Sequence, residues 1–186
     1  EWWGVKGMGT MPHALIQLFK GDVVVAAEAY HVTFPEDDLI VLVDYNNDVI
    51  TDALRVARHF GEALKGVRID TSRTMVDQYF IRNPEVMGSF DPRGVNAELV
   101  CALRRALDAE GFGHVQIVVS GGFDKDRILM FEREGVPVDM YGVGASLLKI
   151  NIGFTGDNVL LNGEHCAKAG RKLNPNPRLE KVAYKV

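Results

Sequence analysis

Short apolar runs alternate with helix-like stretches along most of this chain, and this alternation restricts the fold more than any other feature. The runs cover residues 39–43, 67–69, 115–119 and 138–141. Helical patterns cover about 49–64, 72–81, 96–110 and 124–134, and an opening strand near Val5 leads into helices at about 13–19 and 22–31. Short buried strands between helices predict βαβ units, in which helices cover a parallel sheet.

About five strands joined by right-handed crossovers allow two α/β architectures, an open doubly wound sheet or most of a TIM-like barrel. A closed eight-stranded barrel needs about 250 residues, whereas this chain has 186. The chain starts Glu1-Trp2-Trp3 without Met and reaches a core strand almost at once, which favours a fragment lacking its first strands. We therefore expect an incomplete barrel, because distinctive residues follow every strand, as on a barrel's C-terminal face.

The last part of the chain has a different pattern. Residues 150–154 and 158–163 alternate and turn at glycine, which indicates antiparallel strands, and the prolines in 174–177 exclude a helix there. We expect residues 1–148 to form the barrel portion. Residues 149–186 are expected to be the C-terminal β segment of a second, sandwich-like domain.

Composition limits the classes of function. Lys and Arg number 21 against 25 Asp and Glu, a net charge of −4 that argues against a nucleic-acid partner. No apolar run approaches the roughly 18–20 residues of a membrane span, so no membrane partner is expected. Cys101 and Cys166 lie far apart and in no CxxC pair, which predicts no metal ligands and suits a reducing cytoplasm.

Two glycine-rich turns follow the last two predicted strands. Ser120, Gly121 and Gly122 end one strand before a helix, and Gly142 and Gly144 end the next. Glycine lets backbone N–H groups approach an anion closely, and paired turns of this kind match the phosphate site of α/β barrels. The alternative is that each glycine only makes a tight turn.

Acidic residues follow two other strands. Asp44 and Asp70 each come just after an apolar run, where barrel enzymes place catalytic groups. Such a carboxylate can accept hydrogen bonds from ribose hydroxyls or hold Mg²⁺ through water. The alternative is helix capping, but Thr71 or its neighbour can cap in place of Asp70. Arg68 lies two residues before Asp70 and points the same way on a continuous strand.

Two further aspartates are interpreted structurally: Asp48 as a helix cap, and Asp52 as exposed surface. Thr10 belongs to a turn in which Pro12 presets a helix, so His13 lies in the first helical turn, where it can act as a base or as a nucleophile toward a phosphoryl group. The other histidines, His31, His59, His114 and His165, are interpreted as surface residues without partners.

These motifs together resemble nicotinate phosphoribosyltransferase. The motifs are Gly9-Thr10-Met11-Pro12-His13-Ala14, Val43-Asp44-Tyr45, Gly66-Val67-Arg68-Ile69-Asp70-Thr71, Val118-Val119-Ser120-Gly121-Gly122-Phe123 and Tyr141-Gly142-Val143-Gly144. The segment from Ala169 to Arg178 fits as well, so the resemblance covers nearly the whole chain, as a C-terminal portion of the archaeal or bacterial form. Each motif alone is weak, but five in this order are specific.

The resemblance implies the barrel of type II phosphoribosyltransferases and a reaction of NAD biosynthesis. Nicotinate and phosphoribosyl pyrophosphate give nicotinate mononucleotide and pyrophosphate, with ATP hydrolysis through a phosphohistidine and with Mg²⁺ carried by the phosphates. His13 matches that histidine, Asp70 the residue that orients the ribose hydroxyls, and Arg68 a neighbour of the pyrophosphate. Asp44 matches an acidic residue of the site. The remaining expected substrate contacts are Thr10, Thr71, Ser120, Gly121, Gly122, Gly142 and Gly144.

The family also implies a homodimer whose active site is completed across two subunits. This chain departs from the family at Thr71-Ser72-Arg73, where Ser-Gly-Asp is usual, and at Tyr45-Asn46-Asn47-Asp48, where Thr-Tyr-Asp is usual. Three other functions stay open: a non-catalytic fragment that binds phosphate ligands or interacts with other proteins, a related nicotinamide or quinolinate phosphoribosyltransferase, and another barrel enzyme that acts on a sugar phosphate.

Overall fold

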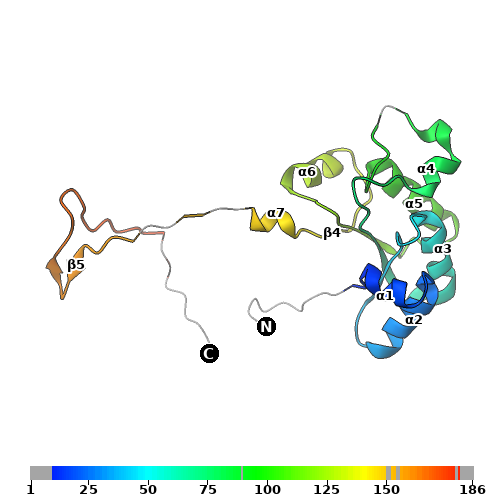
Figure 1. The fold of residues 1–186 in the computed structure, drawn as a ribbon, viewed down its shortest axis with the longest axis horizontal. Coiled ribbons are helices and arrows are strands. Elements are labelled where there is room, and N and C mark those ends of the chain that lie inside the picture. Colours follow the sequence, from blue (N-terminus) through cyan, green and yellow to red (C-terminus); the bar gives the residue numbers. More distant parts are fainter. Residues whose placement is uncertain (1–9, 89, 150–151, 154–155, 179, 181–186) are drawn as a thin grey trace. The chain divides into compact units, whose positions relative to one another are not determined.

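Four parallel strands form a single sheet in the order β1-β2-β3-β4, and Figure 1 shows helices packed around this sheet. They are β1 (Leu39–Leu42), β2 (Leu64–Ile69), β3 (Gln116–Val119) and β4 (Met140–Tyr141). Leu42, Arg68, Val118 and Met140 lie in register across all four strands. Because the strands run in one direction, their carboxyl ends lie at the same end of the sheet, where the residues that follow each strand meet.

The structure is a computed structural model that describes residues 10–88, 90–149, 152–153, 156–178 and 180. It divides the chain into two units, residues 1–149 and 150–186, which are described separately. The predicted strand near Val5 lies outside the described residues. Among the residues described, no helix is both long and apolar enough to cross a membrane.

Helices connect and cover the strands of the first unit. The α-helices are α1 (His13–Leu18), α2 (Val23–Thr33), α3 (Val49–Phe60), α4 (Gln78–Arg82), α5 (Ala97–Ala109), α6 (Lys125–Arg133) and α7 (Ala145–Leu148). Two 3₁₀ turns cover Gly61–Ala63 and Pro84–Val86. Helix α3 packs between α2 and α5 and against β2, and α2 also contacts β1. The crossover helices α3 and α5 thus lie side by side, and α2, which precedes β1, packs beside α3.

The local sequence explains these boundaries. Asp22, Asn96 and Asp124 each cap a helix, because their side chains accept a backbone N–H from the first turn of α2, α5 and α6. The strands are short and apolar because they are buried, and the in-register residues Val41, Val67 and Ile117 are completely inaccessible to solvent.

The predicted α/β class with a parallel sheet is confirmed, but no closed barrel is present among the described residues. Four strands form an open sheet with β1 and β4 at its edges, whereas a barrel of this type closes with eight. The strand order contains no reversal, unlike the switch point of a doubly wound sheet.

The helix predicted over 72–81 is wrong in its first half. Met75 N donates to Ser72 O in a turn, and Val76 forms an isolated antiparallel bridge with Arg93. Helix α4 begins only after Asp77, whose carboxylate accepts the N–H of Tyr79. An Asp in that position ends the preceding turn and starts the helix.

The second unit contains one described hairpin. Strands β5 (Leu160–Leu161) and β6 (Glu164–His165) pair antiparallel. Asn162 and Gly163 join them, both with positive φ, as a tight hairpin turn requires. Of the expected strand at 150–154, residues 150, 151 and 154 lie outside the described residues, and the sandwich-like domain stays a prediction.

Candidate functional site

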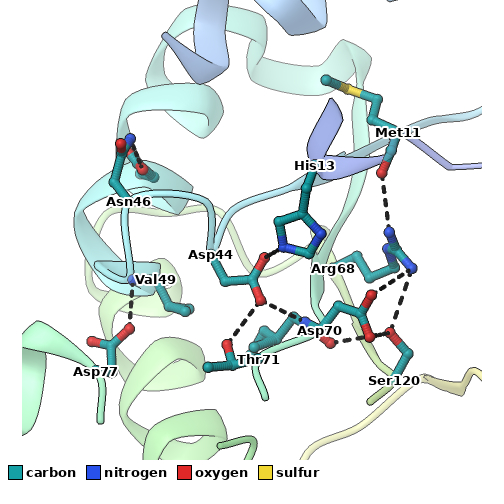
Figure 2. Close-up of polar contacts among 12 residues, drawn as sticks. Met11, His13, Asp44, Asn46, Val49, Arg68, Asp70, Thr71, Asp77 and Ser120 are labelled. Carbon is teal, nitrogen blue, oxygen red and sulfur yellow. Dashed lines mark hydrogen bonds and ion pairs between the residues drawn. The ribbon is translucent and has the colours of Figure 1, made fainter. Parts of the chain in front are cut away.

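The carboxylate of Asp44 lies at the centre of the polar cluster that follows the strands (Figure 2). Asp44 comes two residues after β1 and is 4% exposed. Its Oδ2 accepts the backbone N–H of Asp70 at 2.9 Å and the hydroxyl of Thr71 at 2.8 Å. Its Oδ1 lies 3.1 Å from Nε2 of His13. One buried carboxylate therefore connects helix α1 with the loop after β2.

Helix α1 begins at His13 and presents its ring next to Asp44. The His13 side chain is 45% exposed, whereas that of Asp44 is 1% exposed. With Nε2–H donating to the carboxylate, the neutral ring carries its lone pair on Nδ1. Nδ1 has no hydrogen-bond partner among the described residues. The arrangement orients a half-exposed imidazole for proton transfer or nucleophilic attack.

Arg68, Asp70 and Ser120 connect the ends of β2 and β3. The hydroxyl of Ser120 donates to Asp70 Oδ1 at 2.8 Å, and Arg68 Nη1 lies 3.6 Å from Asp70 Oδ2. Arg68 Nη2 donates to the carbonyl of Met11 at 3.0 Å. The Asp70 side chain is 29% exposed, so an oxygen of this carboxylate can accept a hydrogen bond from a ligand.

The glycine-rich turn after β3 is partly exposed at Gly121, exposed at Gly122 and buried at Phe123. Gly121 and Gly122 have φ values of 85° and 78°, which residues other than glycine rarely adopt. The N–H groups of Gly121, Gly122 and Phe123 donate to no acceptor among the described residues. Asp124 caps the helix that follows. Unpaired N–H groups in such a turn can bind an oxyanion.

The second glycine turn packs against the first at Gly142. Its N–H donates to the carbonyl of Val119 at 2.7 Å. A Cβ added at Gly142 would lie 2.9 Å from the Cβ of Ser120, so only glycine allows this close approach. Gly144 lies at the start of α7, and a Cβ there would meet no atom within 4 Å. The structure thus brings Gly142, but not Gly144, against Ser120.

Two predicted contact residues already bind protein groups. The Thr71 side chain is buried and donates to Asp44, so it positions that carboxylate. The hydroxyl of Thr10 donates to the carbonyl of Ile40 in β1 at 3.3 Å.

Several structural interpretations from the sequence need correction. Asp52 is not exposed: it is 3% accessible, and burial raises the pKa of its carboxyl, although Asn46 and Arg55 both donate to it. Asp48 occupies the cap position of α3 without a side-chain cap, because Val49 N donates to Asp77 instead.

Three of the four histidines interpreted as unpartnered surface residues differ, whereas His165 is exposed as expected. His59 lies 2.7 Å from Glu28, and His114 is 3.3 Å from the carbonyl of Gly61. His31 is partly buried. These contacts join residues far apart in the sequence, so spacing alone did not indicate them.

Two arginines near the first glycine turn were not predicted to belong to the site. Arg127 Nη1 donates to the carbonyl of Gly121 at 2.9 Å, and Arg73 Nη2 donates to that of Gly122 at 3.2 Å. Burial and, less strongly, the charge of Arg73 lower the pKa of Arg127. Both line a hollow of about 410 Å³ together with Asp91, Arg93, Asp126 and Met130. The departure at Thr71-Ser72-Arg73 noted in the sequence is a signal for Arg73 alone, and no feature of the sequence indicated Arg127.

Comparison with known proteins found curated relatives that are nicotinate phosphoribosyltransferases. No protein-family model matches the chain. A nicotinate phosphoribosyltransferase of Mycobacterium tuberculosis is 32% identical over 148 residues, which are 78% of this chain and 27% of that protein. A nicotinate phosphoribosyltransferase of Bacillus subtilis is 28% identical over 145 residues, 75% of this chain and 24% of its own length.

A solved structure agrees with the sequence relatives. The crystal structure of nicotinate-nucleotide pyrophosphorylase from Pyrococcus furiosus matches with a TM-score of 0.66 and 31% identity, over 93% of this chain and 39% of that one. The chain spans about a quarter of the length of the curated relatives it matches. The resemblance found in the sequence is therefore confirmed: the curated homologues of this chain are nicotinate phosphoribosyltransferases.

Proposed function

We propose that this chain provides part of the active site of an enzyme that transfers a phosphoribosyl group to nicotinate. The products are nicotinate mononucleotide and pyrophosphate, and the reaction serves NAD biosynthesis. The observation that carries the proposal is the cluster of Arg68, Asp70 and Ser120 beside the unpaired N–H groups of Gly121 and Gly122. A cation, a partly exposed carboxylate and an anion-binding turn are the groups that a sugar bearing a 5-phosphate and a pyrophosphate requires.

In this reaction the C1–O bond to pyrophosphate breaks and the pyridine nitrogen bonds to C1. The Asp70 carboxylate accepts hydrogen bonds from the ribose hydroxyls, and Arg68 neutralises charge on the leaving pyrophosphate. The backbone N–H groups of Gly121 and Gly122 hold the 5-phosphate, together with the turn from Gly142 to Gly144, and Ser120 contributes through its hydroxyl, which donates to Asp70. Thr10 and Thr71 act indirectly, since their hydroxyls bind Ile40 and Asp44.

Mg²⁺ is expected to accompany the phosphates of the substrate. The described residues contain no group of three or more His, Cys, Asp or Glu that could hold a metal by themselves. Mg²⁺ commonly uses one or two carboxylates together with substrate phosphates and water. The partly exposed Asp70 fits this role, because among the described residues its Oδ2 contacts only Arg68, at 3.6 Å. The ion would supply charge neutralisation on the pyrophosphate.

We propose that ATP hydrolysis is coupled to this transfer through His13. In this step Nδ1 attacks the γ-phosphorus, ADP leaves, and water later releases phosphate from the ring. The support is the contact between Nε2 and Asp44, which orients the half-exposed ring and leaves Nδ1 without a partner among the described residues. The carboxylate stabilises the charge that the ring gains on phosphorylation.

The finer expectations about architecture and setting belong to the same proposal. The unreversed order of the four parallel strands supports a segment of a barrel. A homodimer and a cytoplasmic location are inferred from the family resemblance, and sedimentation and cell fractionation of the natural protein test them.

Pyrophosphate release by the natural protein tests the proposal. Phosphoribosyl pyrophosphate should release pyrophosphate only when nicotinate is added, and nicotinamide and quinolinate serve as competing acceptors. Asp70→Asn should weaken binding of phosphoribosyl pyrophosphate by roughly tenfold or more, since it loses hydrogen bonds to a charged acceptor. Asp48→Asn, in an ion pair with Arg82, is the matched control. Binding of phosphoribosyl pyrophosphate without nicotinate-dependent release would identify a binding module instead of this enzyme.

A further inference from the structure

Two guanidinium groups hold the carbonyl side of the glycine turn after β3. Arg127, on α6, donates from Nη1 to Gly121 O at 2.9 Å. Arg73, in the loop after β2, donates from Nη2 to Gly122 O at 3.2 Å. Two successive carbonyls of this turn are therefore fixed by side chains from two different segments.

The geometry of the peptide bond transmits this contact to the opposite side of the turn. No peptide bond among the described residues is cis, and in a planar trans peptide the C=O and the following N–H point in opposite directions. The contact of Arg127 with Gly121 O therefore directs the N–H of Gly122 away from Arg127. The contact of Arg73 with Gly122 O directs the N–H of Phe123 away from Arg73 in the same way. These are two of the N–H groups without an acceptor among the described residues.

Arg127 is itself held firmly. Its guanidinium lies 4.1 Å from the ring centre of Phe123, and its second terminal nitrogen donates to the carbonyl of Val95. A fork with two carbonyl acceptors over an aromatic face is a geometry that lysine cannot reproduce. Arg73 is more exposed and contributes one hydrogen bond to the turn.

We propose that Arg127 and Arg73 are positioning residues that pre-orient the N–H groups of Gly122 and Phe123 for the phosphate of the substrate. The inference rests on the proposed function, because it assigns these N–H groups to a phosphate. Glycine is conformationally permissive, and two glycines in succession would otherwise leave these peptides free to rotate. Fixing their carbonyls in advance removes this ordering cost from binding.

Substitution by lysine separates positioning from charge. Arg127→Lys keeps the positive charge but loses the fork, and Arg73→Lys does the same at the exposed site. Arg93→Lys is the matched control, because Arg93 lines the same hollow but its side chain binds Asp91. Inorganic phosphate is titrated into the full chain while the amide resonances of Gly122 and Phe123 are followed by NMR, and thermal unfolding without phosphate checks that each variant folds.

We expect phosphate to shift both amides in the parent chain. Arg127→Lys should weaken phosphate binding by about fivefold to tenfold and reduce the shift at Gly122, and Arg73→Lys should do so by about threefold, mainly at Phe123. The phosphate affinity of Arg93→Lys should stay within about twofold of that of the parent chain. Unchanged affinity in both Arg127→Lys and Arg73→Lys, with normal amide shifts, would overturn the positioning role but leave the phosphate site intact. No response of either amide in the parent chain would instead overturn the proposed phosphate site.

Discussion

The close approach of Gly142 to Ser120 predicts a stability difference between two neighbouring glycines. In Gly142→Ala the new Cβ would lie 2.9 Å from Ser120 Cβ and 3.6 Å from Val119 O. The Ser120 Cβ is bound directly to the main chain, so backbone must move to relieve the contact. Overpacking of this kind costs about 1–3 kcal/mol, and the lower entropy of the unfolded alanine chain offsets about 0.4–1 kcal/mol.

The net cost is therefore about 0–2.6 kcal/mol, and its middle value of about 1.3 kcal/mol corresponds to a melting temperature lower by roughly 3–5 °C for a chain of this size. Displacement of Ser120 should also weaken binding of phosphoribosyl pyrophosphate, because the Ser120 hydroxyl donates to Asp70. Gly144→Ala is the matched control, since its Cβ would meet no atom within 4 Å. It should change stability by less than about 0.5 kcal/mol. Urea and thermal unfolding measure both variants, and equal stabilities would refute the close approach.

Two further predictions concern buried and partly buried groups. Asp77→Asn should destabilise the fold by about 1–3 kcal/mol in urea unfolding. Asp77 accepts the N–H groups of Val49 and Tyr79 on separate oxygens, whereas an amide offers only one oxygen. An unchanged midpoint of urea unfolding would contradict this role. Burial, assisted by the hydrogen bond to Glu132, raises the pKa of Tyr141 to about 12. The stabilisation from this neutral phenol should be complete below about pH 10 and lost as pH rises through about 12. In a pH titration followed by tyrosinate absorbance, Tyr141→Phe should lose the component that ionises last. An unchanged titration curve would contradict the raised pKa of Tyr141.

The sequence predicted those elements whose pattern depends on local burial. Each apolar run corresponds to a strand of the sheet, although the run over 138–141 forms strand only at Met140–Tyr141. The predicted helices over 49–64 and 96–110 became α3 and α5 with small changes at their ends. These elements were predictable because the spacing of apolar residues indicates directly which face of a helix or strand is buried.

The errors arise where a distant residue decides the structure. The segment 72–77 looked helical. Instead, residues 72–75 form a turn, and Val76 after it is extended in a bridge with Arg93. Asp52 looked solvated, but Asn46 and Arg55 bind it, and Asn46 also binds the carbonyl of Gly21. A charge pattern along one helix cannot reveal partners from other segments.

The candidate site was predictable as a set of residue types at strand ends, but its connections were not. Asp44 and Asp70 follow strands that are neighbours in the sheet, so chain order and the parallel rule bring them to one edge. Nothing in the sequence indicates that Asp44 accepts the backbone N–H of Asp70. The contacts of Arg73 and Arg127 with the glycine turn likewise depend on the path of two loops.

The geometry around Asp44 determines which substitutions can separate the two proposed steps. One oxygen of this carboxylate faces His13, and the other holds the N–H of Asp70 and the hydroxyl of Thr71. A change at Asp44 therefore disturbs the imidazole and the loop that carries Asp70 together, and its effect cannot be assigned to phosphoryl transfer or to sugar binding. His13→Gln leaves the Oδ2 contacts in place, and Asp70→Asn leaves its own backbone N–H on Asp44. Phosphoryl uptake from ATP and binding of phosphoribosyl pyrophosphate should thus separate in these two variants and fall together in Asp44→Ala.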